Sequence, residues 1–319
     1  MAWATRRPSA FLISAGLLAA GFFWSSLDGS CCSAWSKVRI LRAKALGDLP
    51  RVAWHDVGRS IVSGECELTR QLDEEITSAK LLAEKTYQGR KLKQFRTTLG
   101  DFWIPVPGRA QIEWLIWEMV VESDYESGDV AIRAGDVVVD CGAHVGVFTR
   151  LALRQGAGLV VAIEPDPTHI ACLEANLAEE IADGRVLLVK AGVWGRRDSL
   201  ILHTAENFSL SNSFVYELDD QEGGVPVLPL DDIVKELQLD RVDFIKMDIE
   251  GSERRALQGA AKTIERFRPR MALCSYHRQD DPVVLPQVVQ SFHADYRIHG
   301  KDLDVCHGDH VNPKVLFFE

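Results

Sequence analysis

Short hydrophobic runs alternate with longer amphipathic stretches from Gly128 to the end of the chain. This alternation predicts strands separated by helices, the pattern of a mostly parallel sheet with helices on both faces. The predicted strands are 136–140, 159–163, 186–190, 242–247, 270–276, 295–299 and 313–318. The predicted helices are 145–155, 167–182, 231–238, 252–266 and 282–292.

The region before Gly128 shows a different pattern. Leu68, Leu72, Ile76 and Ala79 recur on one helical face, so the segment from Glu67 to Phe95 is predicted to be a helical arm. Residues 102–107 are typical of a strand, and 110–122 are typical of a helix with one buried face. Either ordinary packing or an acceptor pocket explains the tryptophans at 103, 114 and 117, and packing is favoured.

The N-terminal segment is uncharged over residues 10–27 and follows Arg6 and Arg7. Its length fits either a short membrane anchor or a long signal-peptide core. Asp28 interrupts the small residues that a cleavage site would need, which favours the anchor. Basic residues downstream, between 37 and 44, outnumber those upstream, so we expect the large domain on the cytoplasmic side.

The composition limits the possible architectures and partners. A chain of 319 residues with 46% hydrophobic residues is large enough for one substantial α/β domain and an accessory region. We therefore divide it into a signal-anchor at 1–29, a basic linker and helical arm at 30–99, and a catalytic domain at 100–319. The net charge of -10 argues against nucleic acid as a partner, because phosphate binding needs a basic face.

The seven cysteines are scattered and form neither a disulfide framework nor a CxxC zinc site. Cys141, Cys172 and Cys274 fall in segments that we expect to be buried, where a free cysteine acts as a small apolar residue. The catalytic domain is therefore expected to be reduced.

The turn after the first predicted strand carries the most information about ligands. Asp140, Gly142 and Gly146 follow the apolar run 137–139, with helix-forming residues directly behind. Glycines at such a turn let the backbone approach a ligand, and the following helix presents free amide groups. Glu164, 18 residues after Gly146, ends the second strand, where a carboxylate can accept hydrogen bonds from ribose hydroxyls. The spacing DxGxxxG lacks the glycines that cradle a pyrophosphate, so it favours S-adenosylmethionine over NAD.

Longer stretches carry a family resemblance. DVVVDCGAHVGVFTRLAL, VVAIEPDPTHIACLEANL, VPVLPLDDIV and VDFIKMDIEGSERRALQGA resemble the FkbM family of S-adenosylmethionine-dependent methyltransferases over roughly residues 100–319. The resemblance implies a Rossmann-like, seven-stranded class I methyltransferase sheet and methylation of hydroxyl oxygens on sugars and secondary metabolites. It also implies cofactor contacts from the residues Asp140, Gly142, Ala143 and Gly146 at the methionine end, Glu164 at the ribose, and Asp166, Gly192 and Val193 at the adenine end.

Asp248, Glu250 and His277 are the candidate catalytic residues, because they fall at the ends of later predicted strands. Asp248 is expected beside the transferred methyl group, and the ordinary pKa of histidine, near 6.5, suits His277 as a base. Glu250 can equally be a helix cap, and Lys246 is expected in a structural ion pair.

The sequence offers two metal sites, neither of which is favoured. Magnesium bound by Asp231, Asp248 and Glu250 is chemically possible. The cluster at Cys306, His307, Asp309 and His310 is better explained as a solvated loop.

These residues together favour a membrane-anchored O-methyltransferase that uses S-adenosyl-L-methionine. Its acceptor would be a hydroxyl of a sugar, a lipid-linked molecule or a secondary metabolite. Two alternatives stay open: an NAD-dependent oxidoreductase, and a membrane-tethered binding module that keeps the fold without catalysis.

Overall fold

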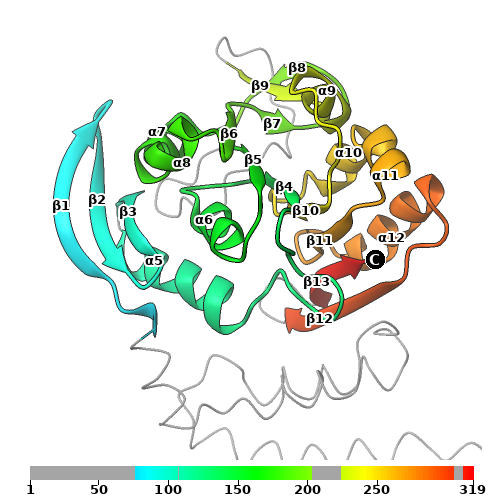
Figure 1. Ribbon diagram of the computed structural model, residues 1–319, viewed down its shortest axis with the longest axis horizontal. Coiled ribbons are helices and arrows are strands. Elements are labelled where there is room, and N and C mark those ends of the chain that lie inside the picture. The colour runs from blue at the N-terminus through cyan, green and yellow to red at the C-terminus, as the bar shows by residue number, and fades with distance from the viewer. Residues whose placement is uncertain (1–75, 107, 203–223, 305–311) are drawn as a thin grey trace, which may run out of the picture.

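The computed structural model describes residues 76–319, except 107, 203–223 and 305–311. Its centre is a seven-stranded sheet with the order β12-β13-β11-β10-β4-β5-β6 (Figure 1). The strands are β4 (Val137–Cys141), β5 (Leu159–Ile163), β6 (Val186–Val189), β10 (Phe244–Met247), β11 (Arg270–Cys274), β12 (Ile298–Asp304) and β13 (Asn312–Phe318).

The sheet is mostly parallel. Strand β13 is antiparallel to both of its neighbours, β11 and β12, whereas β6, β5, β4, β10 and β11 pair in parallel. All seven predicted strands of this region are present, and the α/β fold class is confirmed.

Helices cover both faces of the sheet, because alternate strand residues point to opposite sides. Val138, Val160 and Phe244 belong to one buried cluster, while their neighbours Val139, Val161 and Ile245 belong to another. The helices are α6 (Val147–Arg154), α7 (Pro167–Asn176), α8 (Ala178–Ala182), α9 (Leu230–Glu236), α10 (Glu253–Gln258), α11 (Ala261–Phe267) and α12 (Asp281–Phe292).

A second, small sheet lies beyond the β6 edge, at the top of Figure 1. It has the order β7-β9-β8, formed by Gly192–Val193, Val225–Leu228 and Asp198–Leu200. It follows directly from β6 and therefore positions the Gly192–Val193 segment.

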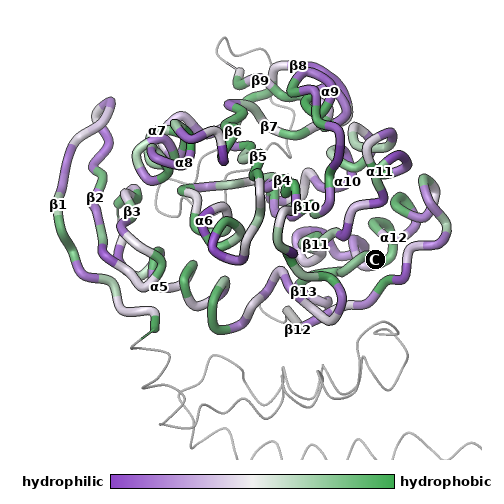
Figure 2. The backbone as a smooth tube through the Cα atoms, viewed as in Figure 1, coloured by the Kyte–Doolittle hydropathy of each residue, from purple (hydrophilic) through white to green (hydrophobic). Residues whose placement is uncertain are grey.

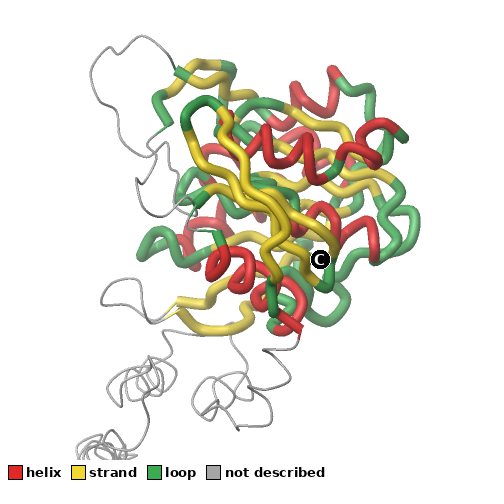
Figure 3. Tube along the Cα trace, turned by 90° about the vertical axis from the view of Figure 1, so that its left-hand side faces the viewer, coloured by secondary structure: helices red, strands yellow, loops and turns green. Residues whose placement is uncertain are grey.

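The predicted helical arm is wrong in its described part. Residues 80–105 form an antiparallel meander of β1 (Lys80–Tyr87), β2 (Arg90–Thr97) and β3 (Gly100–Pro105). Figure 3 views this meander face on, across the front of the α/β core. The domain boundary expected between residues 99 and 100 falls inside this sheet, just before β3.

A tight turn explains why the arm is a hairpin. Gln88 and Gly89 both have positive φ, 47° and 79°, and Tyr87 pairs with Arg90, as in a two-residue type I′ turn. Figure 2 shows hydrophilic and hydrophobic residues mixed along β1 and β2, with no long hydrophobic run. The spacing of Leu68, Leu72, Ile76 and Ala79 that predicted the helix ends before β1, and the exposed Leu81 and Leu82 do not continue it.

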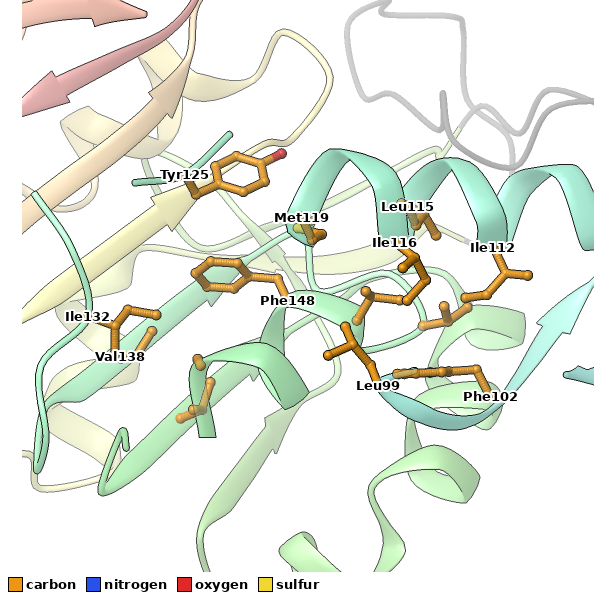
Figure 4. Close-up of a cluster of buried hydrophobic side chains, with 14 of the residues drawn as sticks. Leu99, Phe102, Ile112, Leu115, Ile116, Met119, Tyr125, Ile132, Val138 and Phe148 are labelled. Carbon is orange, nitrogen blue, oxygen red and sulfur yellow. The ribbon is translucent and has the colours of Figure 1, made fainter. Parts of the chain in front are cut away.

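The helix predicted at 110–122 is confirmed as α5 (Arg109–Ile116), which continues as a π-helical turn, η1 (Trp117–Val121). Its buried face joins β3 and α6 in one hydrophobic cluster, with Phe102 at one end and Tyr125 near the other (Figure 4). Trp103 packs against that cluster, whereas Trp114 is 49% exposed and lies against Trp117.

The predicted membrane segment lies outside the described residues. Among the helices of the described part of the chain, none is long and apolar enough to cross a membrane. The three cysteines expected to be free, Cys141, Cys172 and Cys274, are unpaired and buried, as predicted.

One buried amide joins the meander to the core. Asn176, at the end of α7, accepts a hydrogen bond from the Trp103 amide and donates to the carbonyls of Trp103 and Val145. The side chain thereby connects β3 to the loop that follows β4.

We expect Asn176→Asp to lower the free energy of unfolding by about 3 kcal/mol, because a carboxylate would face two buried carbonyl oxygens. Urea denaturation measures this, with the exposed Gln88→Glu as the control amide-to-acid change. A loss of less than about 0.5 kcal/mol, the size of ordinary surface effects, would contradict the assigned role.

Candidate active site

The turn after β4 is shaped by a contact between strand ends. Gly142 has φ +80°, and a Cβ there would lie 2.0 Å from the carbonyl oxygen of Asp248. Any side chain would therefore push the ends of β4 and β10 apart. Contact with the protein's own backbone therefore already requires a glycine at this position.

Gly146 begins α6 in the left-handed region, with φ +89°. A Cβ at this position would lie 2.9 Å from Cδ1 of Leu177, so close packing also limits the residue. No side chain caps α6. The amides of Gly142 and Ala143 both donate to the carbonyl of Ile163, which ties the turn to β5.

A buried ion pair supports the turn from below. The Lys246 Nζ lies 3.2 Å from Oδ1 of Asp140 and donates to the Gly142 carbonyl at 2.8 Å. Oδ2 of Asp140 accepts from the Thr149 hydroxyl at 2.7 Å. Burial opposes a charge on Lys246, but Asp140 and Asp248 more than compensate and raise its pKa above the usual value. The predicted ion pair of Lys246 is confirmed, and its partner Asp140 lies beneath the turn.

Glu164 lies directly after β5, beside the same turn. Its carboxylate accepts hydrogen bonds from the His144 amide at 2.9 Å and the Asp166 amide at 3.0 Å. His169 Nδ1 lies 3.3 Å from Oε1 of Glu164. Glu164 is 5% exposed, and these contacts fix its carboxylate at the strand end.

The residues expected at the adenine end of the cofactor, Asp166, Gly192 and Val193, have structural roles in the fold. Oδ1 of Asp166 accepts from the amides of Thr168 and His169, so Asp166 is the N-cap of α7. Gly192 and Val193 form β7 and are buried. They follow β6, whose Val189 carbonyl accepts from the Glu164 amide, so they lie on the β6 side of the turn.

His144 lies in the turn that follows β4. It has a left-handed backbone with φ 51°, and its ring lies edge-on to His169 at 4.2 Å. Burial lowers the pKa of His144 well below the usual value, so the ring is neutral.

Asp248, Glu250 and His277 converge at the ends of β10 and β11. His277 Nε2 lies 3.3 Å from Oε2 of Glu250 and 3.6 Å from Oδ1 of Asp248. The other oxygen of Asp248, Oδ2, accepts a hydrogen bond from Tyr125 at 2.7 Å. The three predicted catalytic residues therefore form one cluster, next to the Gly142 turn that the Asp248 carbonyl contacts.

Glu253 completes this cluster and was not predicted. It is fully buried at the start of α10, and its Oε1 lies 3.0 Å from Nδ1 of His277 and accepts from the Ile249 amide. The only sequence signal was a third acid three residues after Glu250. Tyr125 carried no signal at all, because it lies in the irregular segment before β4.

The charges around His277 change its expected chemistry. Burial disfavours a charged ring, but Glu253, Glu250 and Asp248 together raise the pKa of His277 well above its usual value. Burial also raises the pKa of Glu250. The ordinary pKa near 6.5 expected for a histidine base does not apply, since the cluster favours a positive charge at this position.

Asp231 does not lie with Asp248 and Glu250, so the magnesium site that these three residues would form is not assembled. Asp231 accepts from the amides of Lys262 and Thr263 and from the Thr263 hydroxyl, so it caps the start of α11. His277 instead lies with Asp248 and Glu250. The cluster at 306–310 lies outside the described residues.

A family model for the methyltransferase FkbM domain matches residues 140–298. The chain belongs to the FkbM methyltransferase family. The match begins at Asp140, includes Glu164 and the acidic cluster, and ends at Ile298, the first residue of β12.

Individual known proteins are also similar to this chain. The 31-O-demethyl-FK506 methyltransferase FkbM of Streptomyces tacrolimicus is 29% identical over 183 residues, which cover 47% of this chain and 68% of that protein. A crystal structure of the methyltransferase FkbM from Methylobacillus flagellatus is 27% identical, with a TM-score of 0.46. That comparison covers 60% of this chain but only 46% of that one. Aeropyrum pernix fibrillarin, solved with S-adenosyl-L-methionine, is 9% identical with a TM-score of 0.35, covering 75% of this chain and 98% of that one.

A second group of buried acidic residues lies near the cluster of Asp248, Glu250 and His277. Lys314, on β13, pairs with Glu118 at 3.0 Å and with Asp124. Burial of Glu118 raises its pKa to about 7; Lys314 lowers this pKa, whereas the nearby Asp124 raises it. One lysine thus serves two buried carboxylates, and Glu118 holds its proton more tightly in the folded state than in the unfolded state.

A raised folded-state pKa stabilises the protein below the unfolded value, and this contribution is lost as the pH rises through the folded value. We therefore expect the wild type to lose on the order of 3 kcal/mol of unfolding free energy relative to Glu118→Gln between about pH 5 and about pH 8. Chemical denaturation of both proteins across this range measures the difference. A difference independent of pH would rule out a proton on Glu118.

Proposed function

We propose that this FkbM-family protein transfers a methyl group from S-adenosyl-L-methionine to a hydroxyl oxygen. The observation that carries the proposal is the meeting of three features at adjacent strand ends. These are the turn 142–146, the carboxylate of Glu164, which is expected to bind the ribose, and the cluster of Asp248, Glu250 and His277. In a parallel sheet, ligands bind outside these carboxyl ends.

The donor side fits S-adenosylmethionine better than a dinucleotide. The turn has no glycine-rich pyrophosphate cradle, and S-adenosylmethionine has no phosphate to bind. Glu164 would accept hydrogen bonds from the ribose hydroxyls, with its orientation set by the amides of His144 and Asp166. The Gly142–Gly146 backbone would contact the methionine end. This geometry and the family assignment both speak against an NAD-dependent oxidoreductase.

The acceptor side supplies negative charge where a proton must be removed. In methyl transfer, the acceptor oxygen forms a bond to the methyl carbon while the carbon–sulfur bond breaks, and its electron pair stays on the sulfur of S-adenosylhomocysteine. The hydroxyl proton must leave. Glu250 is the candidate to accept it, because its side chain is 26% exposed, against 7% for His277.

An oxygen acceptor is supported by the curated relative, which is named as a 31-O-demethyl-FK506 methyltransferase. A hydroxyl on a sugar, a lipid-linked molecule or a secondary metabolite fits this chemistry. Exposed Trp114, whose ring lies 5.2 Å from that of Trp117 at an angle of 37°, would offer such an acceptor an apolar surface.

Calorimetry with S-adenosyl-L-methionine on the full chain tests the donor site. We expect one cofactor per chain, with affinity reduced at least about tenfold in Glu164→Gln, because the ribose would lose a charged acceptor. Glu174→Gln is the matched control. Glu174 lies on α7, the helix that follows Glu164, but it is exposed and pairs with Lys190. Absence of binding, or equal binding by Glu164→Gln, would refute the donor site.

A panel of labelled-methyl acceptors separates an active enzyme from a binding module. Transfer to a hydroxyl compound supports the proposed reaction, whereas cofactor binding without transfer to any acceptor favours the module. The sequence-based localisation is a separate proposal: residues 10–27 would keep the full-length protein in the membrane fraction after carbonate extraction. Release into the soluble fraction would contradict that anchor.

A further inference from the structure

We infer that Asp248, Glu250 and His277 form a binding site for one divalent cation of the Mn²⁺ or Mg²⁺ class. The inference extends the proposed function, because the same cluster would serve the acceptor hydroxyl. Binding of the cation itself depends only on the protein's own groups.

The spacing of the three side chains suits one shared ion. One atom from each residue lies within 4.8 Å of the other two, and Nε2 of His277 is 3.3 Å from Glu250 and 3.6 Å from Asp248. An ion about 2.1 Å from each ligand places two ligands about 3.0–3.4 Å apart at angles between 90° and 110°. Little movement would be needed to close this set around a cation.

Unsatisfied atoms inside the cluster provide an independent observation. Nε2 of His277 is buried without a hydrogen-bond partner in the described part of the chain, and so is Oδ1 of Asp248. The His277 side chain is only 7% exposed, and its Nε2 is directed at the two carboxylates. Buried polar atoms normally have partners, so two that face each other across 3.6 Å indicate a ligand between them.

Neighbouring groups hold the ligand atoms in the required state. Glu253 is fully buried and lies 3.0 Å from Nδ1 of His277, so that nitrogen keeps its proton. The cation would displace the proton that the charged ring carries on Nε2 and bind to that nitrogen. Tyr125 donates to Oδ2 of Asp248, so Oδ1 is the oxygen that remains. This is the carboxylate–histidine–metal arrangement in which an outer carboxylate orients the ligand.

The ligand types select the class of ion. Two carboxylates and one imidazole suit Mn²⁺, and Mg²⁺ when water fills most other positions, better than a thiolate-preferring ion. The cluster also has more negative than positive groups: Asp248, Glu250 and Glu253 surround one histidine. Lys246 is already engaged by Asp140 and the Gly142 carbonyl.

A cation here would have a defined chemical effect. Coordination of the acceptor hydroxyl would lower its pKa, so that its proton passes to the uncoordinated oxygen of Glu250 or to water. The oxygen then attacks the methyl carbon, and the electron pair of the carbon–sulfur bond goes to sulfur. No oxidant or further reactant is required.

Mn²⁺ binding to the chelator-treated full chain, followed by electron paramagnetic resonance, tests the site directly. We expect one tightly bound Mn²⁺ per chain, and binding weakened at least about tenfold in Glu250→Gln. Glu253→Gln, which changes the partner of His277 Nδ1 and of the Ile249 amide but not a ligand of the cation, is expected to weaken binding about 10- to 100-fold. Glu174→Gln is the matched control and should bind as the wild type does.

Because Glu250 is partly exposed, we expect its variant to fold. Circular dichroism checks that each variant is folded. Equal Mn²⁺ binding by the wild type, Glu250→Gln and Glu253→Gln would overturn the site, since it would reflect only the acidic surface of the chain. S-adenosyl-L-methionine binding is measured on the same samples. Its loss with Mn²⁺ binding intact would refute the proposed function and not the cation site.

Discussion

The buried ion pair between Lys246 and Asp140 is the interaction on which the candidate site depends. It joins β10 to β4 at the sheet's centre, and the same ammonium group donates to the Gly142 carbonyl. A charged pair this deep costs desolvation free energy, so it is weak evidence for stability. Its clearer effect is geometric, because it sets the position of the turn that follows β4.

The positions of the other site residues follow from that turn. Gly142 lets the end of β10 approach to contact distance, which brings Asp248 and the acids behind it beside the donor loop. The His144 amide at the top of the turn fixes the carboxylate of Glu164 on the β5 side. The turn, Glu164 and the cluster around His277 thus meet because parallel strands of the sheet end at one edge.

Much of this arrangement was predictable from the sequence. The period-two strands, the helices between them and the acids at strand ends follow from local patterns, and all seven strands of the large sheet are present. The meander was missed because the helical spacing of the residues before Lys80 was extended to Phe95, while the Gln88-Gly89 turn decides the structure of residues 80–97.

Other parts depend on contacts that no local pattern shows. Tyr125 reaches Asp248 from a segment more than a hundred residues earlier, and Glu253 is recognisable only once α10 places it behind His277. Asp231 belongs to the stretch VPVLPLDDIV that resembles the family, but its side chain caps the start of α11. Such roles depend on tertiary packing, so the strand ends were predictable, but the composition of the cluster was not.

A crystal structure of the complex with S-adenosylhomocysteine tests the central claim most directly. The account predicts density along the Gly142–Gly146 turn, with the ribose hydroxyls on Glu164 and the sulfur facing the Asp248 cluster. A separate cavity of about 590 Å³ lies between the meander and α6, lined in part by Gly100, Arg150 and Glu179. Ligand bound in that cavity, with the turn empty, would contradict the account.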